Sequence, residues 1–143
     1  MTGGPEMNLF RGAAIALITA VMAAGTGAAA IPDAPVGVWR NQKNSVHIRI
    51  APCGPVLCGT IVWANEKAKK DAREGGTDPL VGTRIFKDLH KDDKGRWRGK
   101  VFVPDINMSF SGTVKLITAD TINTRGCLFS GIFCKSRVWV RVS

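Results

Sequence analysis

Residues 96–117 read RWRGKVFVPDINMSFSGTVKLI, and this stretch decides the fold. Apolar or small residues occupy every second position on both sides of residues 104–107 (PDIN), at Trp97, Gly99, Val101, Val103, Met108, Phe110, Gly112, Val114 and Leu116. A period of two indicates strands with one buried and one wet face. Pro, Asp and Asn are residues that turns favour. The stretch therefore predicts two strands, 96–103 and 108–117, joined by a turn.

The same pattern of short β-rich runs between Gly, Pro, Asn and Asp continues along the chain. It predicts further strands over 36–41, 45–51, 57–64, 83–88, 120–127 and 135–142. The one long connection, residues 65–82, is charged in its first half and broken by Gly75-Gly76. We expect an exposed loop there with one helical turn.

Eight sequential strands with one wet face need a way to protect their edges. The sequence therefore predicts an all-β, up-and-down barrel of antiparallel strands, with a two-sheet sandwich as the alternative. The residues expected to point inward are Val46, Ile48, Ile50, Val101, Phe110, Val114, Leu116, Val138 and Val140.

The N-terminal segment has the features of a secretory signal. Residues 12–30 (GAAIALITAVMAAGTGAAA) carry no charge, follow Arg11 and end in small residues. The most apolar part is shorter than a membrane span, so a cleaved signal is favoured over a retained anchor. We expect a signal peptide over 1–30, starting at Met1 or Met7, and a single β-barrel domain over 31–143. The mature chain, with no transmembrane segment, would then be periplasmic or secreted.

Four cysteines form two close pairs, Cys53 with Cys58 and Cys127 with Cys134. An even number in a small exported domain favours disulfides. Facing hairpin positions are near enough for each local pair to bond. The spacings fit zinc sites and C-x-x-C redox motifs poorly. In an up-and-down barrel, these two hairpins would lie at opposite ends.

Several blocks together resemble a bacterial family, the domain of unknown function 2147. These are Gly37-Val38-Trp39, Cys53-Gly54, residues 57–63 (LCGTIVW), residues 97–100 (WRGK), residues 125–127 (RGC) and residues 134–141 (CKSRVWVR). The resemblance implies an exported domain with a lipocalin-like or streptavidin-like barrel, and it offers no catalytic residues. The family usually has a Tyr shortly after the Pro-Asp turn, where this chain has Phe110.

No group of residues predicts catalysis. His47 and His90 both lie in polar surroundings typical of surface histidines, and Asp88, Asp92 and Asp93 are spaced unlike an EF-hand and have lysine neighbours. We therefore expect no enzymatic activity, no metal and no cofactor.

Two surfaces are candidates for binding. A barrel of eight strands either is filled by side chains or holds one small ligand. A small hydrophobic ligand would contact Phe110, Leu128, Phe129, Ile132 and Phe133; the apolar stretch 128–133 would alternatively plug the barrel or dip into a membrane.

The second candidate surface is basic and aromatic. The net charge of +9 favours acidic partners, although many exported bacterial proteins are simply basic. An anionic envelope component, lipid or glycan rather than nucleic acid, would bind Arg96, Trp97, Arg98, Lys100, Arg137, Trp139 and Arg141. The sequence leaves the oligomeric state open.

Overall fold

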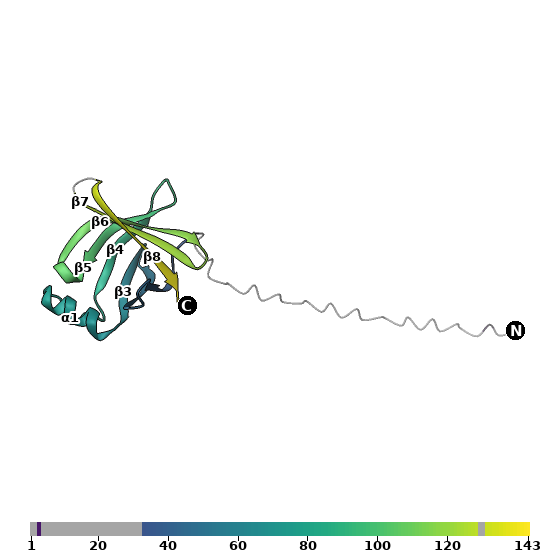
Figure 1. Cartoon of the computed structure of the whole chain (residues 1–143). Coiled ribbons are helices and arrows are strands. Elements are labelled where there is room, and N and C mark those ends of the chain that lie inside the picture. Colours follow the sequence, from purple (N-terminus) through teal and green to yellow (C-terminus); the bar gives the residue numbers. More distant parts are fainter. Residues whose placement is uncertain (1–2, 4–32, 129–130) are drawn as a thin grey trace.

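The computed structural model describes residues 3, 33–128 and 131–143, and the expected signal peptide lies almost wholly outside them. The described chain forms eight antiparallel strands that close into one barrel in sequence order, with β8 returning to β1 (Figure 1). The strands are β1 (Gly37–Asn41), β2 (Val46–Cys53), β3 (Val56–Ala64), β4 (Arg84–Lys91), β5 (Trp97–Val103), β6 (Met108–Thr118), β7 (Thr121–Leu128) and β8 (Ile132–Arg141). This confirms the up-and-down barrel, because a sandwich would leave two sheets unjoined.

Two strands extend three residues beyond a predicted end, more than any of the others. β4 continues to Lys91 because the backbone at Asp88 takes a positive φ of 53° and the register shifts between Lys87 and His90. β8 begins at Ile132, inside the stretch interpreted as a hairpin tip. Irregularities of this kind let a strand continue where its alternation is broken.

The long connection holds a nine-residue helix, α1 (Glu66–Glu74), rather than a single helical turn. The Asn65 side chain caps its start by accepting a hydrogen bond from the Ala68 N–H at 2.8 Å. Three ion pairs at helical spacing follow, Glu66 with Lys69, Lys67 with Asp71 and Lys70 with Glu74.

The helix packs against the turn between β5 and β6, which contains the short 3₁₀ helix η1 (Pro104–Ile106). The Thr77 hydroxyl donates a hydrogen bond to the Pro104 carbonyl at 2.9 Å. A side chain at Gly75 would collide with the Asp105 backbone, so glycine permits this close approach. Helix and turn are therefore fixed to each other at one end of the barrel.

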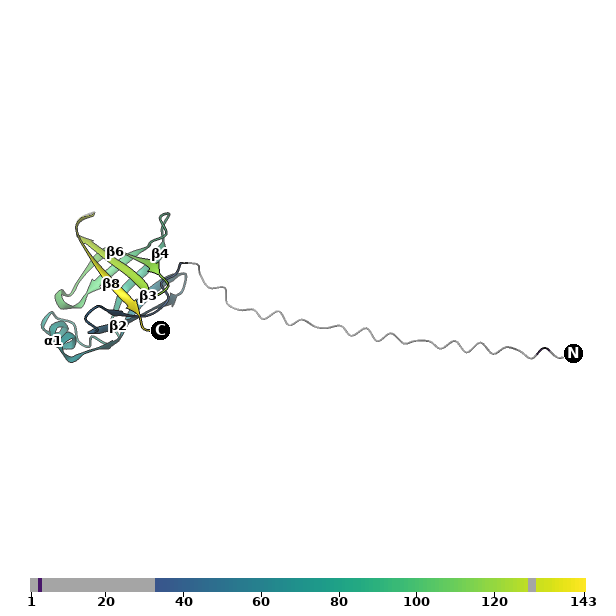
Figure 2. The ribbon, with the colours of Figure 1, turned by 45° about the vertical axis from the view of Figure 1, so that its right-hand side comes forward.

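The turns alternate between two ends. The terminal end carries residues 33–36, the turns at 54–55, 92–96 and 119–120, and the C-terminus. The helix end carries the turn at 42–45, the α1 segment, η1 and the β7–β8 turn. In two views, α1 and the β7–β8 hairpin stand on opposite sides of the helix end (Figures 1 and 2).

Both predicted disulfides are present. Cys53–Cys58 has a Cα–Cα distance of 5.8 Å and lies at the terminal end. Cys127–Cys134, with a Cα–Cα distance of 4.1 Å, lies at the helix end. The two bonds therefore fasten local hairpins at opposite ends, as the strand order requires.

The prediction of which side chains point into the barrel is correct for β2, β5 and β6 but wrong for β8. Trp139 is 9% exposed and pairs with the buried Ile122, whereas Val138 is 38% exposed. Directly paired residues of antiparallel strands share a face. Val138 and Val140 therefore point outward, and Lys135, Arg137, Trp139 and Arg141 belong to the inner face.

Candidate functional site

The interior is filled by large side chains at the terminal end and along β1–β4. They are Trp39, Ile48, Ile50, Leu57, Phe86, Leu89, Trp97, Val114, Ile122 and Trp139, none more than 9% exposed. Gly59 faces the Phe86 ring at so short a distance that a methyl group would collide with it. This half of the barrel is a packed core.

Residues 33–36 close the terminal end through their backbone carbonyls. Trp97 Nε1 donates to the Asp33 carbonyl at 3.2 Å, and Trp39 Nε1 donates to the Pro35 carbonyl at 2.9 Å. Arg141 donates to the Val36 carbonyl at 3.0 Å and to the Ala119 carbonyl at 2.7 Å.

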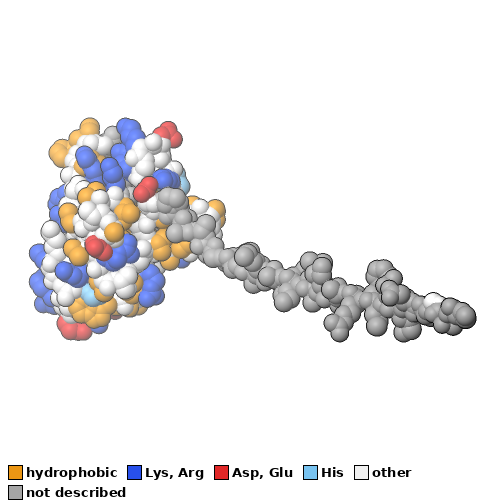
Figure 3. Space-filling view, turned by 90° about the vertical axis from the view of Figure 1, so that its right-hand side faces the viewer, with side chains coloured by type: hydrophobic (Ala, Val, Ile, Leu, Met, Phe, Trp, Pro, Cys, Tyr) orange, Lys and Arg blue, Asp and Glu red, His pale blue; other side chains and the backbone are white. Residues whose placement is uncertain are grey.

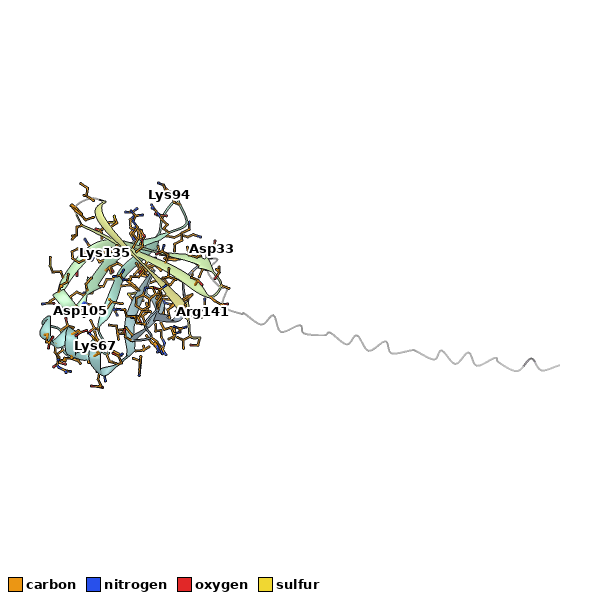
Figure 4. All side chains as sticks on the ribbon, in the orientation of Figure 1. Asp33, Lys67, Lys94, Asp105, Lys135 and Arg141 are labelled. Atoms are coloured by element: carbon orange, nitrogen blue, oxygen red, sulfur yellow. A yellow bond between two sulfur atoms is a disulfide. The ribbon has the colours of Figure 1, made fainter. Side chains whose placement is uncertain are left out.

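The Arg141 guanidinium also lies over the Trp39 ring, 4.2 Å from its centroid. A cation in this position is attracted by the π-electrons of the ring. Figure 4 shows Arg141 and Asp33 on the side of the barrel that holds the termini, away from Lys67, Asp105 and Lys135.

The inner face at the helix end is accessible to solvent. Val101 pairs with Phe110, and Val103 with Met108, on the same face as the buried Phe86. Yet Met108 is 53% exposed, and the other three are only half-buried. A methyl group at Gly126 would meet no atom of the described chain within 4 Å. On β5–β8 the inner face is therefore covered at the terminal end and uncovered at the helix end.

Two cations belong to this uncovered inner face. Arg137 pairs with Thr124, and Lys135 pairs with Gly126. Both side chains are exposed, and neither forms an ion pair with any residue that the structure describes. Arg137 was predicted to lie in a basic and aromatic surface stripe, and Lys135 was not among the predicted site residues.

The short length of β1 leaves this part of β8 with a strand partner on one side only. β1 pairs with Trp139, Val140 and Arg141, whereas residues 132–138 pair with β7 alone within the described chain. Lys135 and Arg137 thus lie on the part of β8 that has no strand partner on its β1 side within the described chain.

The β7–β8 hairpin does not plug the barrel with its described side chains. Leu128, Ile132 and Phe133 are 37%, 60% and 75% exposed. Phe129, predicted to contact a ligand, lies outside the described residues. Of the predicted ligand-binding residues, Phe110 is thus on the inner face at the helix end. Leu128, Ile132 and Phe133 are exposed beside the β7–β8 turn at that end.

The predicted basic and aromatic stripe is not brought together. Trp97 and Trp139 are buried inside the barrel, and Arg96 pairs with Asp92 at 2.9 Å. Arg137 and Arg141 belong to the inner face, which leaves only Arg98 and Lys100 on the outer one.

A different basic surface forms on the outside of β4–β7. The strand register pairs Lys87 with Lys100, and it pairs Thr113 with both Arg98 and Arg125. Lys115 lies two residues after Thr113 on β6, on the same face. We call Lys87, Arg98, Lys100, Lys115 and Arg125 the outer basic face. Extending the alternation of residues 96–103 to the neighbouring strands could have identified it.

The histidines and acidic residues are engaged in local contacts. His47 Nε2 lies 2.6 Å from Asn44 Oδ1, and its ring lies 4.6 Å from that of Trp63; His90 Nδ1 lies 3.2 Å from the Asp88 carbonyl. Within the described chain, no three His, Cys, Asp or Glu side chains are grouped so that they could hold a metal ion.

Asp92 and Asp105 have opposite pKa shifts. Burial opposes the charge of Asp92, but hydrogen bonds from the Arg96 backbone and side chain and the Lys94 backbone outweigh it and lower its pKa. Burial raises the pKa of Asp105, the nearby Asp71 carboxylate adds to this, and Lys67 opposes it.

A surface hollow of about 490 Å³ lies outside the barrel wall. Residues 76–79 and 81–83 of the β3–β4 connection line it together with Phe102 and Asn107. It is separate from the inner face described above, since Phe102 points outward from β5.

An eight-stranded up-and-down barrel with one covered and one uncovered end belongs to the class of lipocalin-like barrels. The fold is similar to that of a solved Helicobacter pylori protein, HP1028, described as belonging to the lipocalin family. The TM-score is 0.59 at 14% sequence identity, over 76% of this chain and 82% of that one.

The chain belongs to the family described as an uncharacterized protein conserved in bacteria (DUF2147), which it matches over residues 37–141. No curated protein matches it. None of the helices in the described part of the chain has the length and apolar character needed to cross a membrane.

Proposed function

We propose that this protein is a non-enzymatic binding module that holds a small apolar or amphipathic ligand at the helix end of its barrel. One observation carries the proposal: on β5–β8, inward-facing side chains are mostly buried at the terminal end but remain accessible at the helix end. Apolar surface left accessible within a fold is typical of a ligand-binding site. The lipocalin-like fold supports a binding role.

The test is titration of the protein with Nile red, a neutral dye that fluoresces in apolar surroundings. We expect saturable binding that is lost in Gly126→Trp, because the added ring fills space next to the inner face. Arg125→Trp, which adds the same ring on the outer face of the same strand, is the control and should bind Nile red normally. Absence of saturable binding to the unmodified chain would refute the proposal.

A second candidate function is association with an anionic lipid or glycan through the outer basic face. The specific observation is that Lys100, Lys115 and Arg125 form no ion pair within the described chain. Figure 3 also shows far more Lys and Arg than Asp and Glu side chains on the terminal-end side. Binding to vesicles containing anionic lipid should weaken with added salt and in Lys100→Gln/Arg125→Gln. Binding that salt does not change would count against it.

We place the mature protein in the periplasm or outside the cell. The two disulfides support this, because such bonds persist in oxidising compartments. N-terminal sequencing of protein from the periplasmic fraction should begin at Ile31. A chain recovered only from the cytoplasm with residues 1–30 attached would refute both the location and the cleavage site.

A further inference from the structure

We infer that the ligand of the helix end is an amphipathic anion, whose carboxylate or phosphate head binds Arg137 and Lys135 while its apolar part lies against Phe110 and Val101. The inference rests on the proposed function and names the chemical class of its ligand.

The register fixes the face to which Arg137 belongs. Arg137 pairs with Thr124, Thr124 with Val114, and Val114 with Trp97. The last three are 7%, 0% and 5% exposed, so this row lies on the inner face. Trp139 donates a hydrogen bond to the Thr124 hydroxyl at 3.0 Å, which fixes the position of the Thr124 side chain beside Arg137.

The next row gives Lys135 free space. Lys135 pairs with Gly126, Gly126 with Gly112, and Gly112 with Gly99. The position above Gly126, directly beside the lysine, is empty of described atoms within 4 Å, and the space above Gly112 is taken by the Val101 side chain. Since residues two apart on a strand are about 7 Å apart, one small anionic group can contact both cations.

The arrangement of β8 is the reverse of what packing alone favours. Its valines, Val138 and Val140, point outward, while Lys135 and Arg137 take inner positions. Folding does not explain two like charges there, because no carboxylate of the described chain pairs with either one. Within the described chain, the Arg137 guanidinium donates one hydrogen bond, to the adjacent Ser136 carbonyl at 3.3 Å, which leaves further N–H donors for an anion.

The apolar part of the ligand has a matching surface. Val101 and Phe110 pair with each other on the inner face, toward the helix end from the glycine row. A charged head at β8 and an apolar chain along β5 and β6 would therefore use neighbouring parts of one surface. An anion bound by an Arg and a Lys gains charge-assisted hydrogen bonds, which are stronger than neutral ones.

The experiment compares two competitors of equal chain length, dodecanoate and dodecanol, for displacement of Nile red from the full mature chain. We expect dodecanoate to bind more tightly to the unmodified protein. In Arg137→Gln/Lys135→Gln, its affinity should fall about tenfold or more while that of dodecanol changes less than about twofold. Lysophosphatidic acid, as a third competitor, distinguishes a phosphate head from a carboxylate.

The matched control is Arg40→Gln/Arg49→Gln, which removes two charges from the outer face of the neighbouring strands β1 and β2. An equal loss of dodecanoate binding in the control would overturn the inference, because general attraction would then explain it. Equal affinities for dodecanoate and dodecanol in the unmodified protein would also overturn it, and would leave the proposed function intact. Failure of Nile red to bind at all would refute the proposed function itself. Unchanged thermal midpoints would show that the variants are folded.

Discussion

The two ends of this barrel share the same strands but differ in how their inner faces are used. At the terminal end, three tryptophans fill the interior and residues 33–36 cover it with backbone carbonyls that accept hydrogen bonds from side chains. At the helix end, α1 packs on the β5–β6 turn, while Met108 and Lys135 stay exposed on the inner face. Burial stabilises the fold at the terminal end, whereas the helix end keeps accessible groups on its inner face.

This division has a physical basis in the size of the chain. A barrel of about 110 residues has a small core, so its stability depends on a few large buried side chains. Concentrating them at one end allows the other end to keep accessible apolar and charged groups. The comparison therefore predicts large stability effects at the terminal end and small ones at the helix end.

The largest expected effect is that of Trp39→Ala. Trp39 is fully buried, and its loss removes the ring, the stacking of Arg141 and the hydrogen bond to Pro35. We expect the free energy of unfolding to fall by about 3–5 kcal/mol, measured by denaturant titration. Met108→Ala at the helix end should cost less than about 1 kcal/mol. Similar losses for both variants would contradict the division into two ends.

A second pair of variants compares arginines on the two halves of β8. Arg141→Gln loses the contact with the Trp39 ring and weakens two hydrogen bonds to carbonyls, so we expect a cost of about 2 kcal/mol. Arg137→Gln should change stability by less than about 0.5 kcal/mol. If Arg137→Gln were as costly, its side chain would be part of the core and not available to a ligand.

Glycines allow a third comparison. A methyl group in Gly59→Ala would overlap the Phe86 ring, and the displaced packing should cost about 1–3 kcal/mol. Gly126→Ala meets no described atom and should leave stability within about 0.5 kcal/mol, or raise it slightly by restricting the unfolded chain. Thermal unfolding of both variants is the measurement, and a large loss in Gly126→Ala would show that the inner face there is already filled.

The sequence predicted the barrel and its disulfides because both depend on local patterns. Alternation of apolar and polar residues indicates strands. When every connection but one is short, consecutive strands lie side by side, and the sheet can close into an up-and-down barrel. Alternation cannot say which of two faces points inward when both carry large apolar groups, as with Trp139 against Val138 and Val140. The pairing of Trp139 with Ile122, seventeen positions away along the chain, decides it.

The candidate site was predicted only in part for the same reason. Phe110 follows the pattern of its own strand and was placed on the inner face. Lys135 and Arg137 were not, because a charged residue is normally assigned to the wet side. The covering of the terminal end by the Asp33 and Val36 carbonyls depends on contacts with Trp97 and Arg141 in distant segments, which no local pattern shows.

The smallest expected effect concerns pH, and it has opposite signs at the two ends. Asp92 lies in the β4–β5 turn of the terminal end, and its lowered pKa means that the fold favours its charged form. That contribution is present above the ordinary pKa of an aspartate and is lost as the pH falls through the lowered value. Asp92→Asn should therefore be less stable than the unmodified protein at pH 7, with a difference that shrinks toward pH 3.

Asp105 at the helix end should behave in the opposite way. Its pKa is raised by burial and by Asp71, so the fold favours the neutral form, and this contribution is lost as the pH rises through the raised value. Asp105→Asn should be slightly more stable than the unmodified protein at pH 7 and equal to it at pH 3. Denaturation midpoints of both variants across this range are the measurement. Differences of the same sign would mean that the α1–η1 junction stabilises the Asp105 charge, and that the helix end is held by ionic contacts rather than by packing alone.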